Sequence, residues 1–103
     1  MNNDSLQFLD DETMVALEEL LEVSGLMREE LFELVEFGVL QPAESSGQRL
    51  FAARCIVQAR RAARLRDDFG LNAPGMALAL AYLERIEALE HRLRELECQL
   101  LRS

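Results

Sequence analysis

The residues best placed to do chemistry are carboxylates on one face of a short predicted helix, residues 28–37. Its apolar residues share one arc at helical spacing: Met27, Leu31, Leu34 and Val35. The outward positions are Glu29, Phe32, Glu33 and Glu36. An exposed aromatic ring inside a charged rim is typical of a protein contact. We predict that this face binds a protein, and the alternative is an ordinary solvated face.

The sign of this charge disfavours nucleic acid as the ligand. Three carboxylates would meet phosphates and acceptor-rich base edges, where DNA readers bring Arg, Lys, Asn or Gln. Acids on the preceding predicted helix are further candidates for the same contact: Glu18, Glu19 and Glu22. A basic protein surface is therefore the expected partner.

Catalytic and metal-binding patterns do not emerge from the sequence. Nothing pairs a nucleophile with a base or places glycine-rich amides around a phosphate. Cys55 and Cys98 match no disulfide or zinc spacing, and His91 is expected to be exposed. We predict no enzyme activity, no metal and no cofactor. The few cysteines, and the lack of a signal peptide or membrane span, favour a cytoplasmic protein.

The net charge of −8 is unevenly distributed along the 103 residues. Residues 1–48 carry twelve acids and one Arg, whereas residues 49–66 carry six Arg and no acid. Within a helix predicted at 52–68, Arg54, Arg60, Arg61 and Arg64 form an exposed stripe. The stripe either contacts phosphates or balances the acidic half of the molecule, and the second interpretation is favoured.

The order of elements predicts a mainly α protein in three parts. Residues 1–12 are expected to form a flexible tail. Residues 13–71 are expected to form a winged helix-turn-helix domain, with a short strand at Thr13–Val15 and a helix from Leu17 to about Ser24, where Gly25 ends it. The small β wing is predicted from Val39-Leu40 and Arg49–Phe51, which bracket a loop at 41–48.

Residues 72–103 are expected to form one long helix that starts at Asn72-Ala73-Pro74. Its first half is apolar nearly all round, which predicts burial. Its second half has a coiled-coil seam for a homodimer: Tyr82, Ile86, Leu89, Leu93, Leu96 and Leu100. Arg85 and Arg92 at g, with Glu90 and Glu97 at e, favour a parallel pair.

Several segments together resemble a known family. They are the Gly38-Val-Leu-x-Pro42 run, Gly47-x-Arg49-Leu50-Phe51, Val57-Gln58 with Leu65-Arg66, and Asn72 through Leu80 before the short zipper. This order resembles the MerR-type winged-helix architecture and, more closely, the chaperone-modulator family. The likeness covers about residues 15–103. MerR-type DNA readers typically have Arg-Tyr-Tyr where this chain has Phe32-Glu33-Leu34.

The resemblance implies a function and a partner. Members of the chaperone-modulator family bind the J-domain of a DnaJ-like co-chaperone, curved DNA-binding protein A, and inhibit it. J-domains present a basic helix to their DnaK-type chaperone, and an acidic face could cover that helix.

The resemblance to MerR proteins also implies an antiparallel pair of C-terminal helices, whereas the charges at the g and e positions favour a parallel pair. The alternative is a MerR-type transcriptional regulator that binds DNA through the Arg stripe and Arg49, for which gel retardation is the test.

Overall fold

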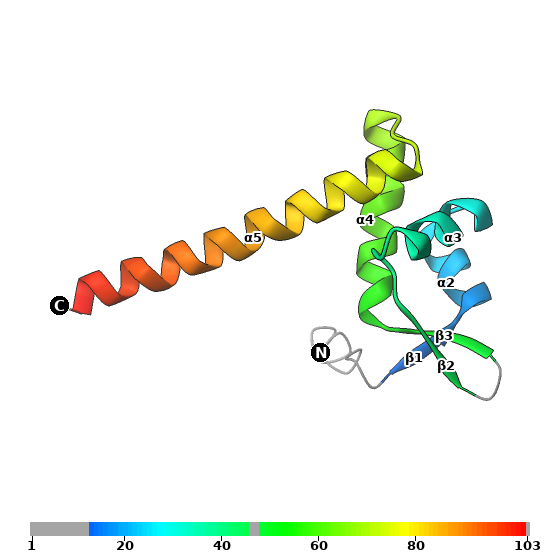
Figure 1. The fold of residues 1–103 in the computed structure, drawn as a ribbon, viewed down its shortest axis with the longest axis horizontal. Coiled ribbons are helices and arrows are strands. Elements are labelled where there is room, and N and C mark those ends of the chain that lie inside the picture. Colours follow the sequence, from blue (N-terminus) through cyan, green and yellow to red (C-terminus); the bar gives the residue numbers. More distant parts are fainter. Residues whose placement is uncertain (1–12, 46–47, 103) are drawn as a thin grey trace.

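The computed structural model describes residues 13–45 and 48–102. Within these ranges the chain forms a small body of helices and a sheet, from which one long helix leaves (Figure 1). The elements are β1 (Met14–Ala16), α2 (Leu17–Ser24), α3 (Arg28–Glu36), β2 (Pro42–Ser45), β3 (Gln48–Ala52), α4 (Arg54–Phe69) and α5 (Ala73–Arg102). The mainly α fold class, with a winged helix-turn-helix and a long final helix, is confirmed. The tail predicted at residues 1–12 lies outside the described residues.

The sheet is antiparallel with strand order β1-β3-β2, so the strand next to α2 pairs with the second strand of the wing. Val15 lies opposite Phe51 in that pair, and both side chains are buried. The amide of Ala53 also donates to the carbonyl of Thr13 at 2.9 Å, which joins the start of β1 to the start of α4. The first strand predicted from sequence therefore forms one edge of the wing sheet.

The predicted wing is displaced at its first strand. Val39 and Leu40 form no strand, because their amides donate to the carbonyl of Leu34, at 2.9 and 3.3 Å, and so end α3. The Leu40 side chain is fully buried, and β2 begins only at Pro42. Much of the predicted loop at 41–48 is consequently strand, while residues 46 and 47 lie outside the described part of the chain.

Glycine ends α2, as the sequence predicts. Gly25 adopts a φ of 83°, and its amide donates to the carbonyl of Leu21 at 3.1 Å. Ser24 Oγ accepts a hydrogen bond from the Leu26 amide at 3.2 Å and so satisfies the backbone inside the turn. A left-handed residue at this position reverses the chain without a Cβ clash, and α3 can start three residues later.

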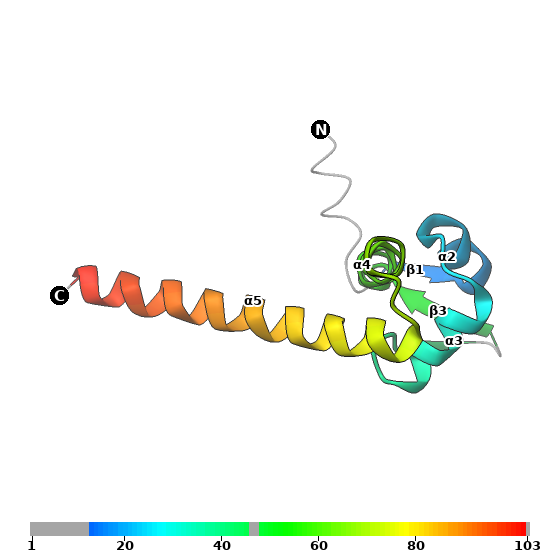
Figure 2. The same ribbon diagram turned by 90° about the horizontal axis from the view of Figure 1, so that it is seen from above.

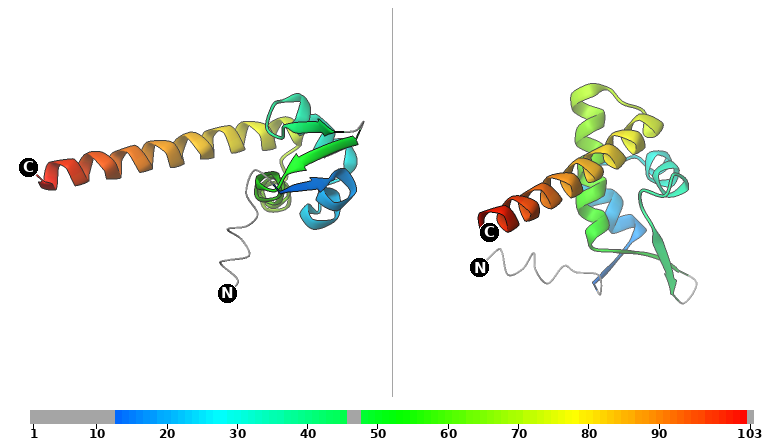
Figure 3. Two further views of the ribbon diagram at one scale, coloured as in Figure 1. Left: turned by 90° about the horizontal axis from the view of Figure 1, so that it is seen from below. Right: turned by 60° about the vertical axis from the view of Figure 1, so that its left-hand side comes forward.

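One hydrophobic core joins the helices to the sheet. Its largest fully buried side chains come from α2, α3, β3, α5 and the segment after α3: Leu20, Leu31, Leu34, Leu40, Phe51, Met76 and Leu80. In Figure 2, α5 starts beside α3 and α4 and then extends away from the body as a single rod. Figure 3 shows the same separation from two other sides. Only the first turns of α5 therefore contribute to the core, through Ala73, Met76, Ala77 and Leu80.

Two packing predictions are wrong. The first half of α5 is not buried all round, because the Leu78 side chain is 58% exposed. Met27, expected on the buried arc of α3, precedes the first turn and is 58% exposed. Leu78 is exposed because it lies on the side of α5 opposite the four buried residues, and Met27 is exposed because it precedes the first turn of α3.

Candidate partner-binding site

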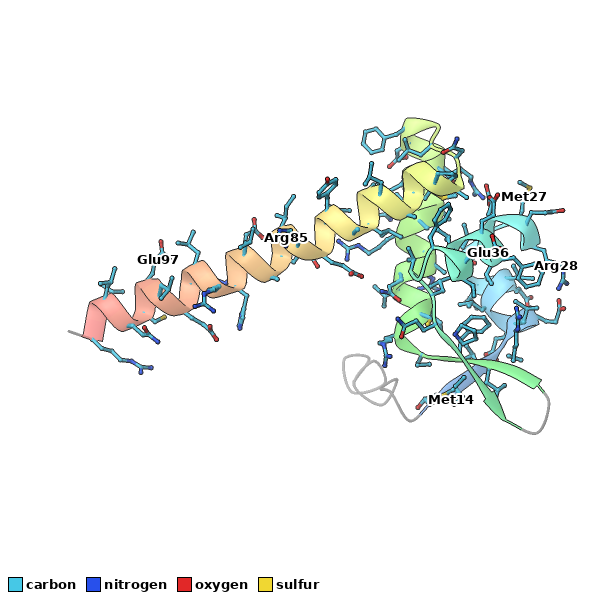
Figure 4. All side chains as sticks on the ribbon, viewed as in Figure 1. Met14, Met27, Arg28, Glu36, Arg85 and Glu97 are labelled. Atoms are coloured by element: carbon cyan, nitrogen blue, oxygen red, sulfur yellow. The ribbon has the colours of Figure 1, made fainter. Side chains whose placement is uncertain are left out.

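Three carboxylates of α3 project from the body into solvent. Leu31 and Leu34 turn inward into the core, and Glu29, Glu33 and Glu36 lie on the exposed side of the same helix. Their spacing of four and three residues places them in one stripe along the helix. Figure 4 shows Glu36 on the body, with Met27 and Arg28 at the other end of α3. The stripe is thus available to a partner along the whole length of α3.

The fourth carboxylate of α3 points the other way. Glu30 Oε1 accepts a hydrogen bond from the Met27 amide at 2.9 Å, which is one half of a capping box. The same oxygen accepts from Arg66 Nη1 at 2.6 Å, and the Glu30 side chain is only 13% exposed. Hydrogen bonds to Asp67 and Glu30 raise the pKa of Arg66. This contact ties α3 to the end of α4 and leaves the other three carboxylates outward.

The acids of α2 extend the negative surface. Glu18, Glu19 and Glu22 are all exposed. Glu18 Oε2 lies 2.8 Å from Arg28 Nη2, so the beginning of α2 adjoins the beginning of α3. An ion pair this exposed contributes little to stability. We call the six exposed glutamates of α2 and α3 the acidic face: Glu18, Glu19, Glu22, Glu29, Glu33 and Glu36.

Phe32 is not the freely exposed ring that the helical pattern suggests. It is partly buried and packs against the hydrophobic core. Arg49, an exposed residue of β3, holds its guanidinium carbon 5.8 Å from the centre of the Phe32 ring. The wing therefore places a cation over the aromatic ring of the acidic face. The helical pattern of α3 alone could not show this contact, because Arg49 comes from a later strand.

Exposed apolar side chains lie instead at the two ends of α3. Met27 precedes the helix and Phe37, which is 54% exposed, follows it. Phe37 also borders an open groove of about 670 Å³ between the end of α3, α4 and α5. Its apolar lining includes Val39, Leu78 and Ala81. The sequence pattern does not set these two side chains apart, because Met27 continues the apolar arc and Phe37 ends the predicted helix.

The Arg stripe of α4 is used in part within the molecule. Arg60 Nε donates to the carbonyl of Val23 at 3.1 Å, near the end of α2. Arg61 Nη2 lies 2.7 Å from Glu87 Oε2 of α5. Arg54 and Arg64 are exposed. These contacts use two of the four arginines within the molecule, but the acid that Arg61 meets belongs to α5 and not to the acidic N-terminal half.

The seam of α5 is exposed on the single chain. All six of its residues, Tyr82, Ile86, Leu89, Leu93, Leu96 and Leu100, are large hydrophobic side chains between 46% and 75% exposed. Arg85 and Glu97 accompany them along the part of α5 that has left the body (Figure 4). A contiguous apolar stripe on a free helix is typical of an interface.

The remaining polar residues of interest lie apart from one another. Cys55 is buried, Cys98 is exposed, and His91 Nε2 lies 3.1 Å from Glu95 Oε2 on the surface of α5. Among residues 13–45 and 48–102, no three His, Cys, Asp or Glu side chains are grouped to hold a metal ion. In the same ranges, no helix is both long and apolar enough to cross a bilayer.

Comparison with known proteins agrees with this architecture. The model of the MerR HTH family regulatory proteins matches residues 15–98. The chaperone modulatory protein CbpM of Coxiella burnetii (strain Dugway 5J108-111) is 40% identical over 82 residues, which cover 79% of this chain and 77% of that protein. The proteins of the same name from Salmonella arizonae and Escherichia coli O1:K1 are 40% and 35% identical, over 76% and 77% of this chain and 74% and 79% of theirs.

The residues matched by the family model run from β1 through the helix-turn-helix, the wing and α4 into most of α5. The matches confirm the resemblance drawn from the sequence, and the named relatives are regulatory proteins. This chain therefore shares the order of elements of that family. In this chain the second helix of the helix-turn-helix presents carboxylates, and α5 presents an exposed apolar stripe. The chain belongs to the MerR-type helix-turn-helix regulators and, within them, to the family of the chaperone modulatory protein CbpM.

Proposed function

We propose that this protein modulates a chaperone system by binding the J-domain of a DnaJ-like co-chaperone, of the type of curved DNA-binding protein A, through its acidic face. The observation that carries the proposal is the outward orientation of Glu29, Glu33 and Glu36 on the second helix of a helix-turn-helix. In a DNA reader this helix enters the major groove. Three carboxylates there would be repelled by phosphates and attracted by a basic protein helix.

The inhibitory step is steric. A J-domain uses a basic helix to engage its DnaK-type chaperone, so a modulator seated on that helix prevents recruitment. The acidic face supplies charge complementarity, which speeds association and suppresses partners of the wrong sign. The exposed Met27 and Phe37 supply apolar contact at the two ends of α3. Neither enzyme activity nor a cofactor is required.

We also propose that two copies associate through the seam of α5. Six apolar side chains repeat in steps of three and four, and no contact within the described part of the chain buries them. A helix this far from the body gains stability by packing against a second helix. The resulting homodimer would carry two acidic faces, one on each body.

Calorimetric titration with a purified J-domain tests the proposed binding. We expect the charge reversal E33K/E36K to abolish or strongly weaken binding. Both positions lie in the second half of α3, where a positive side chain suits the helix dipole, so the fold should survive. The matched control D68K/E95K changes the net charge equally at exposed residues of α4 and α5.

The two outcomes that contradict the proposal are distinct. Equal affinity of wild type and E33K/E36K would remove the acidic face from the interface. Saturable, sequence-dependent retention of duplex DNA at moderate salt, without J-domain binding, would favour a DNA-binding regulator instead. A separate assay connects binding to modulation: wild type should inhibit the stimulation of the chaperone ATPase by the J-domain protein, and E33K/E36K should not.

A further inference from the structure

The position of Arg49 is the feature that the proposed function does not explain. This residue is exposed at the second position of β3, and its guanidinium lies 5.8 Å from the ring centre of Phe32. Phe32 lies on the same helix as Glu29, Glu33 and Glu36. A cation from the wing thus covers an aromatic ring that lies among exposed carboxylates.

A cation above a ring face is an attractive arrangement, because the quadrupole of the ring is negative there. The surrounding carboxylates add to that negative potential. Phe32 itself is packed against the core and cannot turn toward a partner. What it can offer a partner is its ring face, and Arg49 already occupies it.

We propose that the ring face of Phe32 is the receptor for a Lys or Arg side chain of the partner, and that Arg49 is an internal competitor which the partner displaces. This inference rests on the proposed function and adds a recognition site to it. Two cations cannot share one ring face, because their mutual repulsion outweighs what the second gains. Arg49 must move when the partner's cation enters. Because Arg49 is exposed, its side chain can rotate away while the strand that carries it stays in place.

The proposal predicts that truncation of the Arg49 side chain increases the affinity for the J-domain. R49A vacates the ring and removes a positive charge, so binding of the J-domain should strengthen by about two- to five-fold, the effect of a cation–π contact at an exposed site. R28A is the matched control, because Arg28 is another cation beside the acidic face but pairs with Glu18 and not with the ring. The gain from R28A should be smaller.

A double-mutant cycle isolates the role of the ring. In an F32L background, which keeps an apolar side chain against the core, R49A should give no more gain than R28A does. F32Y keeps an aromatic ring and should retain the full gain, which guards against loss of folding in F32L. Thermal unfolding followed by circular dichroism checks that each variant remains folded.

Each outcome decides a separate point. Unchanged or weaker binding by R49A would overturn the role of Arg49 as a competitor for the ring. The proposed function would still stand if wild type binds the J-domain and E33K/E36K does not. Equal gains from R49A in the wild-type and F32L backgrounds would show a general charge effect and overturn the ring as receptor. Absence of binding by folded wild type would remove the proposed function and this inference together.

Discussion

Arg66 Nη1 donates to Glu30 Oε1 at 2.6 Å, and this contact joins the end of α4 to the start of α3. The same carboxylate oxygen accepts from the Met27 amide, so one side chain both caps α3 and holds it against α4. Glu30 and Arg66 are 13% and 25% exposed, so solvent screens their pair far less than it screens the pair of Arg28 with Glu18. The orientation of the acidic face therefore depends on a charge pair beneath it.

Loss of Glu30 should destabilise the fold. E30A removes the cap and leaves Arg66 partly buried with one fewer acceptor, so we expect the free energy of unfolding to fall by about 2 kcal/mol. Urea unfolding measures the change, provided that the dependence of the unfolding free energy on urea concentration is the same in both proteins. E33A, which removes an exposed carboxylate one turn later, should change stability by less than about 0.5 kcal/mol. Equal effects of the two substitutions would show that the Glu30 contact is of no consequence.

The contribution of Arg66 should not depend on pH near neutrality. Its pKa in the folded state is raised by hydrogen bonds to Asp67 and Glu30. When folding raises the pKa of a basic group, the group contributes its full stability at any pH below its pKa in the unfolded chain. That stability is lost only as the pH rises through the pKa in the folded state. The pKa of an unfolded arginine already lies far above neutral pH, and the folded value is higher still. The destabilisation by R66A, measured in urea, should thus be equal at pH 7 and pH 9, and a decline toward pH 9 would contradict this.

How far the sequence predicts the fold depends on whether a feature is local. Gly25 and Asn72 mark helix ends correctly, because a left-handed turn and an Asn cap act within a few residues: Asn72 Oδ1 accepts from the Gly75 amide at 2.9 Å. The strand expected at Val39 and Leu40 is wrong, because their amides cap α3 instead. Propensity alone cannot decide between those two uses of a backbone amide.

The candidate site shows the same division. Periodicity places Glu29, Glu33 and Glu36 outward on one helix, and the structure has them exposed. Contacts between distant elements remain hidden: Arg66 lies 36 residues after Glu30, and Arg49 reaches Phe32 from another element. A sequence pattern predicts which side of a helix or strand a residue lies on, but not which residue of a distant element contacts it there.

Binding to a basic partner should weaken steeply with ionic strength. The acidic face attracts the partner through exposed charges, and the screening length falls from about 10 Å at 0.1 M salt to about 3 Å at 1 M. We expect the association rate to fall more than the dissociation rate changes, as stopped-flow mixing with the J-domain would show. E33K/E36K should flatten the salt dependence. A wild-type association rate that is insensitive to salt would count against electrostatic recognition.

Dimerisation should depend on the middle of the seam. L93D places a carboxylate among Leu89, Leu96 and their counterparts, and we expect sedimentation velocity to show monomers at concentrations where wild type is dimeric. The control H91D introduces the same group at an exposed position outside the seam. Since α5 beyond Leu80 contributes nothing to the core, the body should remain folded in both variants. A dimer that survives L93D would place the interface elsewhere.

The direction of the helix pair can be determined by one charge. In a parallel pair Arg92 faces Glu97 of the second copy, whereas in an antiparallel pair arginines at g lie near arginines. R92E should therefore weaken a parallel dimer by setting Glu near Glu. It should strengthen an antiparallel dimer in which Arg92 faces Arg85 of the second copy, because repulsion there becomes attraction. Following the charge pattern, we expect R92E to raise the dimer dissociation constant.

The swap R92E/E97R separates orientation from damage to the helix. In a parallel dimer it recreates the opposite-charge contact with the partners exchanged, so the dissociation constant should return toward that of wild type. In an antiparallel dimer the swap keeps the opposite-charge contact at position 92 and adds another at position 97, so it should associate at least as tightly as R92E. Both residues are exposed in the single chain, which means that folding of the monomer is unaffected in either case. Sedimentation equilibrium of the three proteins decides the order, and tighter association of R92E than of wild type would establish that the helices run antiparallel.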